Sequence, residues 1–193
     1  MADIEKIGQD QSDEALAVLA QGGDQVAFGV LVRRYEAKLL RYAGRLLFSS
    51  DLDPADVVQD TFVKAYVNLR SFDASRRFSP WVYRIAHNEL VNAVRKKARE
   101  MVDFYDFSSF LPSLPSSASS EGQVDLGLLR EELEKGLDGL PATYREPLVL
   151  FAFEGMSYVE IAEILHLPTS TVGVRISRGK KRLRELCAKL ADH

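Results

Sequence analysis

Apolar side chains recur at helical intervals of three and four residues along nearly the whole chain. No segment alternates apolar and polar positions for long enough to predict a strand, and no internal repeat is visible. The helical pattern breaks between residues 101 and 127, where serines and prolines accumulate. Such a composition buries too little apolar surface to order the segment, so it predicts a flexible linker. The pattern therefore predicts an all-α fold with two small helical domains, residues 1–100 and 129–193, joined by a linker over residues 101–128.

The first informative helix is predicted to begin at Asp53-Pro54, because Asp caps helix N-termini and Pro favours the first helical position. Its core face is predicted to contain Val58, Phe62, Ala65 and Leu69. The opposite face combines carboxylates with valines: Asp56, Gln59, Asp60, Val63 and Val67. A stripe that is partly acidic and partly apolar is typical of a protein-binding surface, and a helix buried on both sides is the alternative.

A second helix is predicted to begin at Ser79-Pro80, after a loop that carries two aromatic rings and two arginines. Its core face is predicted to contain Val82, Ala86, Leu90, Ala93 and Val94. The other face carries Trp81, Arg84, Asn88, Asn92, Arg95 and Arg99. Because rings stack on bases and guanidinium groups hold phosphates, this face predicts a nucleic-acid surface. Ordinary core packing of Trp81 is the alternative.

The C-terminal domain contains a predicted helix-turn-helix. Ser157 and Glu160 have the spacing of a capping box, which starts a short helix, and a turn at residues 166–168 precedes a second helix from near Thr169. The second helix of such a motif usually enters the major groove. Its core side is predicted to contain Val172, Ile176, Leu183, Leu186 and Leu190. Its outward side is predicted to present Ser170, Val174, Ser177, Arg178 and Lys181, with Arg175 and Arg182 on the flank.

The formal net charge is only −3, but the charges are segregated along the chain. Between Thr169 and Arg184 there are six basic groups and no acidic group, and residues 28–100 hold fourteen basic and eight acidic groups. Residues 1–27 and 101–135 each have a net charge of −5. Two basic zones separated by an acidic strip predict two contacts with one polyanion. For the zone between Thr169 and Arg184, a solvated amphipathic helix is the alternative.

The sequence offers no chemistry for an enzyme. It has one cysteine and three scattered histidines, so neither an internal disulfide nor a metal site is predicted. It has no Gly-rich phosphate loop and no histidine paired with a nucleophile, and no cofactor is predicted. The N-terminus is acidic without an apolar block, and the apolar runs are short. A cytoplasmic protein without direct membrane insertion is therefore expected.

Several motifs together resemble the extracytoplasmic-function (ECF) sigma factors of RNA polymerase. DQVAF (24–28), RY (34–35), DVVQDTF (56–62) and FSPWVYRIAHN (78–88) are similar to their region 2. LP (140–141), YR (144–145), EGMSY (154–158), EIA (160–162) and PTSTV (168–172) are similar to their region 4. The resemblance extends from about Ser12 to Leu186, in the family's order, with a linker where the family has one. The combination is highly specific.

The resemblance implies a partner for each surface. It implies that core RNA polymerase is bound by Asp56, Val57, Gln59, Asp60, Val63 and Val67. It implies that the −10 element of promoter DNA is opened, and an unstacked base captured, by Phe72, Arg76, Arg77, Trp81, Arg84, Asn88, Asn92 and Arg95. It implies that the −35 element is read by Ser170, Thr171, Val174, Arg175, Ser177, Arg178, Lys181 and Arg182. It also implies an anti-sigma factor as a partner, which could be membrane-anchored.

The chain departs from the family where the −35 helix begins. The family commonly has Gly-Thr-Val followed by a basic residue and Ser, whereas this chain has Ser170, Thr171, Val172, Gly173 and Val174. The promoter sequence is therefore not transferable, and Val174 is expected to favour a thymine methyl. The expected function is that of an alternative sigma factor. A sigma-like decoy that sequesters an anti-sigma factor needs no arginine faces, and a simple helix-turn-helix repressor needs no polymerase-binding helix.

Overall fold

A computed structural model describes residues 11–47, 50–104 and 133–191, and the regular elements in these ranges are all helical. The first unit contains α2 (Asp13–Gln21), α3 (Gln25–Leu47), α4 (Pro54–Asn68), the short 3-10 helix η1 (Leu69–Ser71) and α5 (Phe78–Phe104). The second contains a helix over residues 133–138, α7 (Ala142–Ala152), α8 (Tyr158–Leu165) and α9 (Thr169–Ala191). The predicted all-α class is confirmed. Within these ranges, no helix combines the length and apolarity needed to cross a bilayer.

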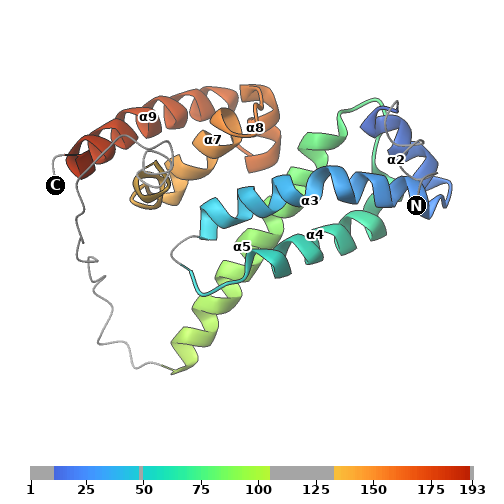
Figure 1. Cartoon of the computed structure of the whole chain (residues 1–193), viewed down its shortest axis with the longest axis horizontal. Coiled ribbons are helices and arrows are strands. Elements are labelled where there is room, and N and C mark those ends of the chain that lie inside the picture. The colour runs from blue at the N-terminus through green and yellow to red at the C-terminus, as the bar shows by residue number, and fades with distance from the viewer. Residues whose placement is uncertain (1–10, 48–49, 105–132, 192–193) are drawn as a thin grey trace.

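The first unit is built around the long helices α3 and α5, with α2 and α4 packed against them (Figure 1). Asp53 caps α4 as predicted, because its Oδ1 accepts a hydrogen bond of 2.8 Å from the Ala55 amide. Ser12 caps α2 in the same way. The core of this unit includes the fully buried side chains Leu16, Leu31, Leu39, Tyr42 and Tyr83.

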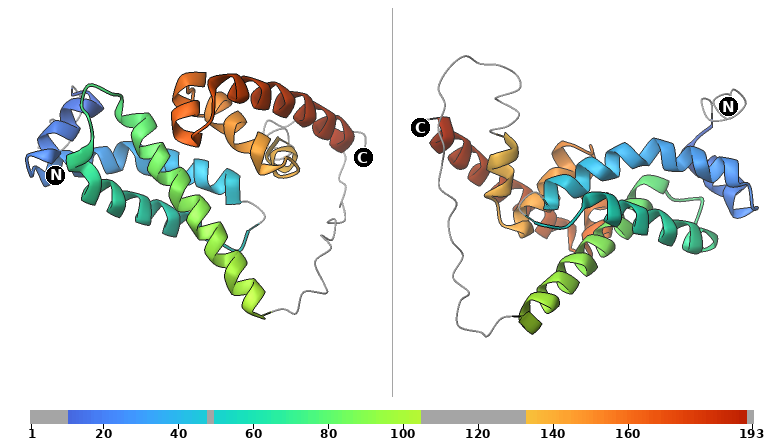
Figure 2. Two further views of the ribbon diagram at one scale, coloured as in Figure 1. Left: turned by 180° about the vertical axis from the view of Figure 1, so that it is seen from behind. Right: turned by 60° about the horizontal axis from the view of Figure 1, so that its bottom comes forward.

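Helix α5 is longer than the sequence pattern predicts. It continues to Phe104, so residues 101–104 are helical and do not begin the linker. Its far end projects from the bundle (Figure 2). This projection explains why Val94, predicted to face the core, is half exposed. Residues 105–128 of the predicted linker lie outside the described residues.

The second unit contains the predicted capping box and helix-turn-helix. The Ser157 amide donates to Glu160 Oε2 at 2.8 Å, and the Glu160 amide donates to Ser157 Oγ at 3.3 Å. His166 ends α8 in the left-handed conformation, with φ of 52°, and the chain turns there into α9. Helix α9 packs on α7 through its buried residues Val172 and Ile176. The predicted helix starts in this unit are therefore confirmed, and so are the core positions Val172 and Ile176. Leu183 and Leu186 are half-buried and pack against the core, and the side chain of Leu190 lies outside the described residues.

The two units are in direct contact, which the sequence did not predict. Helix α8 packs on α5, and α7 packs on α3. Figures 1 and 2 show the second unit lying along one side of these two long helices. This contact brings the first helix of the helix-turn-helix next to the loop that precedes α5.

Candidate nucleic-acid interface

Three aromatic rings cluster where the chain enters α5. The Phe72 ring centroid lies 5.5 Å from that of Phe78 and 5.2 Å from that of Trp81, and Phe78 lies 5.4 Å from Trp81. Phe72 is only 4% exposed and Phe78 is also buried, whereas Trp81 is half-buried. The ring of Phe72, predicted among the −10 residues, is therefore part of the core and forms a wall of the site. Trp81 packs on this cluster with part of its ring and leaves the rest accessible.

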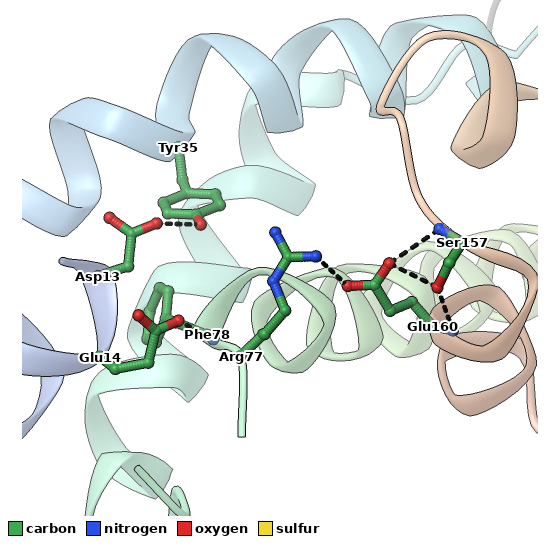
Figure 3. A network of polar contacts seen from close by, with 7 residues as sticks. All are labelled: Asp13, Glu14, Tyr35, Arg77, Phe78, Ser157 and Glu160. Carbon is green, nitrogen blue, oxygen red and sulfur yellow. Dashed lines mark hydrogen bonds and ion pairs between the residues drawn. The ribbon is translucent and has the colours of Figure 1, made fainter. Parts of the chain in front are cut away.

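Helix α2 holds the loop that carries these rings. Gln21 Nε2 donates to the carbonyl oxygens of Leu69, at 2.9 Å, and Phe72, at 2.7 Å. The amide of Phe78 donates to Glu14 Oε1 at 3.0 Å (Figure 3). Both contacts span about fifty residues or more of sequence, and no motif in the N-terminal segment indicated them. Sequence reasoning therefore missed Glu14 and Gln21 as residues that position the loop.

A cavity of about 560 Å³ opens beside the ring cluster. On the side of the first unit, Phe72, Pro80 and Trp81 line it together with three arginines, Arg76, Arg77 and Arg84. On the other side it is lined by Glu160 and Glu163 of α8. An aromatic wall next to several guanidinium groups can stack a base and hold its phosphate, which suits an unpaired nucleotide. Five of the predicted −10 residues are thus brought to one site.

The remaining predicted −10 residues lie farther along α5. Asn88 and Arg95 are exposed. Asn92 lines a different cavity, a groove of about 460 Å³ between α4 and α5, together with Asp56, Gln59 and Asp60. The structure therefore separates Asn92 from Trp81, although helical spacing places both on one face.

The outer face of α4 is exposed as predicted, with one exception. Asp56, Gln59, Asp60, Val63 and Val67 are all exposed, and Val67 reaches 72%. Val57 is 5% exposed and belongs to the core, so its prediction as a partner-binding residue is corrected. The residue that sequence reasoning missed is Tyr66, which is half exposed beside the valines and packs edge-on against Phe28 at 5.0 Å. About three turns of α4 thus present acidic groups next to apolar ones.

The outer face of α9 is a basic surface accessible along its length. Ser170, Val174, Ser177, Arg178, Lys181 and Arg182 are exposed, and Thr171 and Arg175 are half-buried. The guanidinium of Arg182 lies 5.8 Å from the Tyr144 ring centroid, on the flank that faces α7. The predicted division of α9 into a core side and an outward side is confirmed for the described side chains.

One ion pair joins the two units at the cavity. Arg77 Nη1 donates to Glu160 Oε1 at 2.5 Å, while Glu160 Oε2 accepts from Ser157 (Figure 3). Burial alone would raise the pKa of Glu160, but the Ser157 hydrogen bonds and the charge of Arg77 outweigh it and hold this pKa below its ordinary value. Glu160 is therefore ionised at neutral pH. Among the side chains that the structure describes, no three His, Cys, Asp or Glu residues converge as a metal site.

Comparison with known proteins decides the family. The model of Sigma-70 region 2 matches residues 31–100, and that of Sigma-70 region 4 matches residues 130–183. The ECF RNA polymerase sigma factor SigW of Bacillus subtilis is 34% identical over 169 residues, which cover 84% of this chain and 90% of that protein. The chain belongs to the ECF sigma factors. The ECF RNA polymerase sigma-E factor of Escherichia coli K12 is also 34% identical, over 178 residues that cover 89% of this chain and 92% of that protein.

Two solved structures share the fold over most of the chain. CnrH, in complex with the cytosolic domain of CnrY, has a TM-score of 0.67 and 31% identity, over 93% of this chain and 99% of that one. RpoE of Bartonella quintana, in complex with the anti-sigma factor NepR, has a TM-score of 0.65 and 30% identity, over 82% and 95%. The predicted function, an alternative sigma factor that directs transcription, is confirmed at the level of the family, and the decoy alternative is not favoured. Below, the described residues 11–104 (with the gap at 48–49) are called region 2 and residues 133–191 region 4.

The contact between region 2 and region 4 contains functional candidates that the sequence did not reveal. Tyr42, Tyr83 and His87 of region 2 meet Glu146 and Glu154 of region 4. The two tyrosines are buried at helical core spacing, so each was indistinguishable from an ordinary core residue. The only sequence signal was the presence of one carboxylate on each side of the apolar run at residues 147–153.

Proposed function

We propose that this protein binds core RNA polymerase and directs it to a specific set of promoters, with region 2 at the −10 element and region 4 at the −35 element. We place the domain boundaries near residues 100–104 and 129–133. One observation carries the proposal: this member of the family has two cationic sites that differ in shape. One is a ring-walled cavity suited to an unpaired base, and the other is an exposed helix suited to a groove. Run-off transcription with core polymerase on a randomised promoter library tests it directly.

The outer face of α4 is the proposed contact with core polymerase. Exposed valines beside carboxylates supply an apolar patch with a charged rim, as a protein interface requires. The double variant Asp60→Arg/Val63→Glu should abolish co-purification with core polymerase and keep the helical circular-dichroism signal, because both side chains point into solvent. Glu36→Arg, which alters an exposed carboxylate on α3, is the control and should bind normally. Normal binding by the double variant would refute this assignment.

The cavity beside Trp81 is the proposed capture site for an unpaired base of the non-template strand. Stacking contributes about 1–3 kcal/mol per base and can offset the cost of unstacking that base. Asn88 lies one turn beyond Arg84 on α5, whereas Asn92 faces the groove beside α4. Asn88→Ala should therefore reduce promoter opening by about two- to tenfold, the size of one lost hydrogen bond, and Asn92→Ala should not. Permanganate footprinting of unpaired thymines measures opening, and equal effects of the two variants would refute the site.

Partners and location follow from the same proposal. Bond formation belongs to the polymerase, so the chain itself is proposed to have no catalytic activity. It is proposed to act in the cytoplasm, where its polymerase and promoter partners are expected. Similarity to the B. quintana RpoE, which was solved with the anti-sigma factor NepR, supports an anti-sigma factor as a further partner. Co-purification of the tagged chain from its own host tests that partner.

A further inference from the structure

The loop between Phe72 and Phe78 is anchored at its two ends and exposed in between. The rings of Phe72 and Phe78 are buried, whereas the five side chains from residue 73 to residue 77 are all exposed. Two of these five, Arg76 and Arg77, line the cavity proposed to capture a base. The position of these guanidinium groups therefore depends on the contacts that hold the two ends of the loop.

Helix α2 supplies hydrogen bonds to both ends. At the start of the loop, Gln21 Nε2 donates to the carbonyl oxygens of Leu69, at 2.9 Å, and Phe72, at 2.7 Å. At its end, Glu14 Oε1 accepts from the Phe78 amide at 3.0 Å, and an amide in the first turn of a helix has no acceptor within that helix. Glu14 and Gln21 lie two turns apart on α2, so this helix holds the two ends at a separation of about 10 Å along its axis.

Helix α2 is itself fixed to the core of region 2. Leu16 is fully buried. At the start of α2, Asp13 accepts from the Tyr35 hydroxyl of α3 at 2.5 Å and also pairs with Arg34 (Figure 3). The Tyr35 ring lies edge-on to the Phe78 ring, with the centroids 5.4 Å apart. One helix thus connects the long helix α3 to both ends of the loop.

The middle of the loop is folded into a tight turn. Asp73 Oδ1 accepts from the Ser75 amide at 2.9 Å, and the Asp73 carbonyl oxygen accepts from the Arg76 amide at 3.0 Å. An aspartate that binds the backbone two residues on stabilises such a turn and limits its freedom. Because the turn is short and hydrogen-bonded, a shift of either end of the loop should move the guanidinium groups of Arg76 and Arg77.

We infer that α2 positions the loop for capture of the unpaired −10 base, with Glu14 and Gln21 as positioning residues that act through the loop. They set the distance between the loop arginines and the aromatic wall that contains Phe72 and Trp81. Stacking of a base on the wall and contact of its phosphate with the arginines require both groups at a fixed separation. Loss of either anchor should therefore reduce promoter opening and also the discrimination between bases at the captured position. This inference rests on the proposed capture site.

The test compares open complexes on four promoters that differ only at one base of the −10 element. The base chosen is the one at which the wild-type holoenzyme discriminates most strongly, and permanganate footprinting measures opening. Gln21→Met removes the amide donor and keeps the length of the side chain. It should lower opening about tenfold, because two hydrogen bonds are lost, and bring the ratio between the best and worst base close to one. Gln25→Met makes the same change at an exposed position of α3 and should alter neither quantity.

A pair of substitutions at Glu14 separates its hydrogen bond from its charge. Glu14→Leu removes the acceptor of the Phe78 amide and should lower opening several-fold, with a similar loss of base discrimination. Glu14→Gln removes the same charge but keeps an oxygen that can accept, so it should recover most of the wild-type behaviour. Co-purification with core polymerase and affinity for −35 duplexes should stay unchanged in all these variants, since none of them alters the outer face of α4 or α9.

Two results would overturn the positioning role while leaving the capture site intact. The first is an equal loss of opening on all four promoters with an unchanged ratio, because α2 would then only stabilise region 2. The second is a Glu14→Gln variant as defective as Glu14→Leu, because the charge rather than the hydrogen bond would then be required. If Gln21→Met does not fold, the two Glu14 variants decide alone. A wild-type holoenzyme that shows no preference at any −10 base would refute the capture site itself, and the inference with it.

Discussion

The cavity beside Trp81 and the outer face of α9 both present arginines, but they differ in what surrounds those arginines. In the cavity, the arginines stand next to a packed aromatic cluster and opposite two carboxylates of region 4. On α9, they alternate with small residues and one valine along an exposed face that has no acidic side chain between Thr169 and Arg184. The first site can enclose one base, whereas the second can follow a duplex groove without enclosing anything.

The two surfaces also differ in how far they depend on the fold. The aromatic wall of the cavity contains the buried core residue Phe72, so a substitution there should also lower the stability of region 2. The α9 face is made from side chains that leave the core, so its residues can change with little effect on stability. Substitutions should therefore separate the two surfaces by stability as well as by DNA binding.

The largest effect is expected at the aromatic wall. Phe72→Ala should lower the free energy of unfolding by about 3–5 kcal/mol, because it removes a buried ring that contacts Phe78 and Trp81. Val174→Ala on α9 should change it by less than about 0.5 kcal/mol. Urea denaturation followed by circular dichroism measures both. If the Phe72 variant is as stable as the wild type, the ring is a free platform and the contrast between the two surfaces is lost.

A smaller effect is expected within the cationic set of α5. Arg84→Ala should weaken binding of single-stranded oligothymidylate about tenfold, which corresponds to the loss of one charge-assisted hydrogen bond. Arg95→Ala removes the same charge from an exposed position outside the cavity and should have a weaker effect. Fluorescence anisotropy at fixed salt measures both variants. Equal losses would mean that α5 attracts DNA as a diffuse cationic face.

On α9 we expect two kinds of effect on DNA binding, a uniform loss of affinity and a change in base preference. Arg182→Ala should weaken binding of −35 duplexes about equally across sequences and lower the salt slope by about one, as the loss of a phosphate contact does. Val174→Ala should change which base is preferred by about 1 kcal/mol and leave the salt slope unchanged. Titrations at several salt concentrations on a small duplex panel distinguish the two outcomes. Identical behaviour of both variants would reduce α9 to a non-specific basic helix.

The smallest effect is expected from the pH dependence of Glu160. The pKa of this group is lowered in the folded chain, so its contribution is complete above its ordinary value of 4.5 and is lost as the pH falls through the lowered value. Glu160→Gln should therefore reduce thermal stability slightly at neutral pH and lose that difference only in strong acid. Melting curves of the wild type and the variant between pH 3 and pH 7 measure this. A difference that disappears already near pH 6 would contradict the contacts of Ser157 and Arg77 with this carboxylate.

Local features of the fold were predictable because short-range physics determines them. Caps at Asp53 and Ser157, the turn at His166 and the two sides of α9 follow from residue type and helical spacing. The misassignment of Val57 and the unexpected burial of Phe72 have one cause. Angular spacing, or a resemblance, places a residue on a face, but it does not show how deeply neighbouring helices cover that face.

The contact between the regions could not be predicted from spacing. Its tyrosines look like core residues in their own helices, and its glutamates look like surface residues in theirs. The tyrosines and glutamates act as donors and acceptors of one contact only because the fold pairs residues that are 59 to 104 positions apart in the sequence. The separation of Asn92 from the cavity was hidden for the same reason, since it depends on where α4 lies.

The sequence separation of this contact has a consequence during synthesis. Glu146 follows Tyr42 by 104 residues, so at about 5–20 residues per second it leaves the ribosome about 5–20 s later. Throughout that interval the helices of region 2 can fold while their half of the contact has no partner. The hydroxyls of Tyr42 and Tyr83 then have only water to bind, and they exchange it for Glu146 and Glu154 once region 4 has left the ribosome.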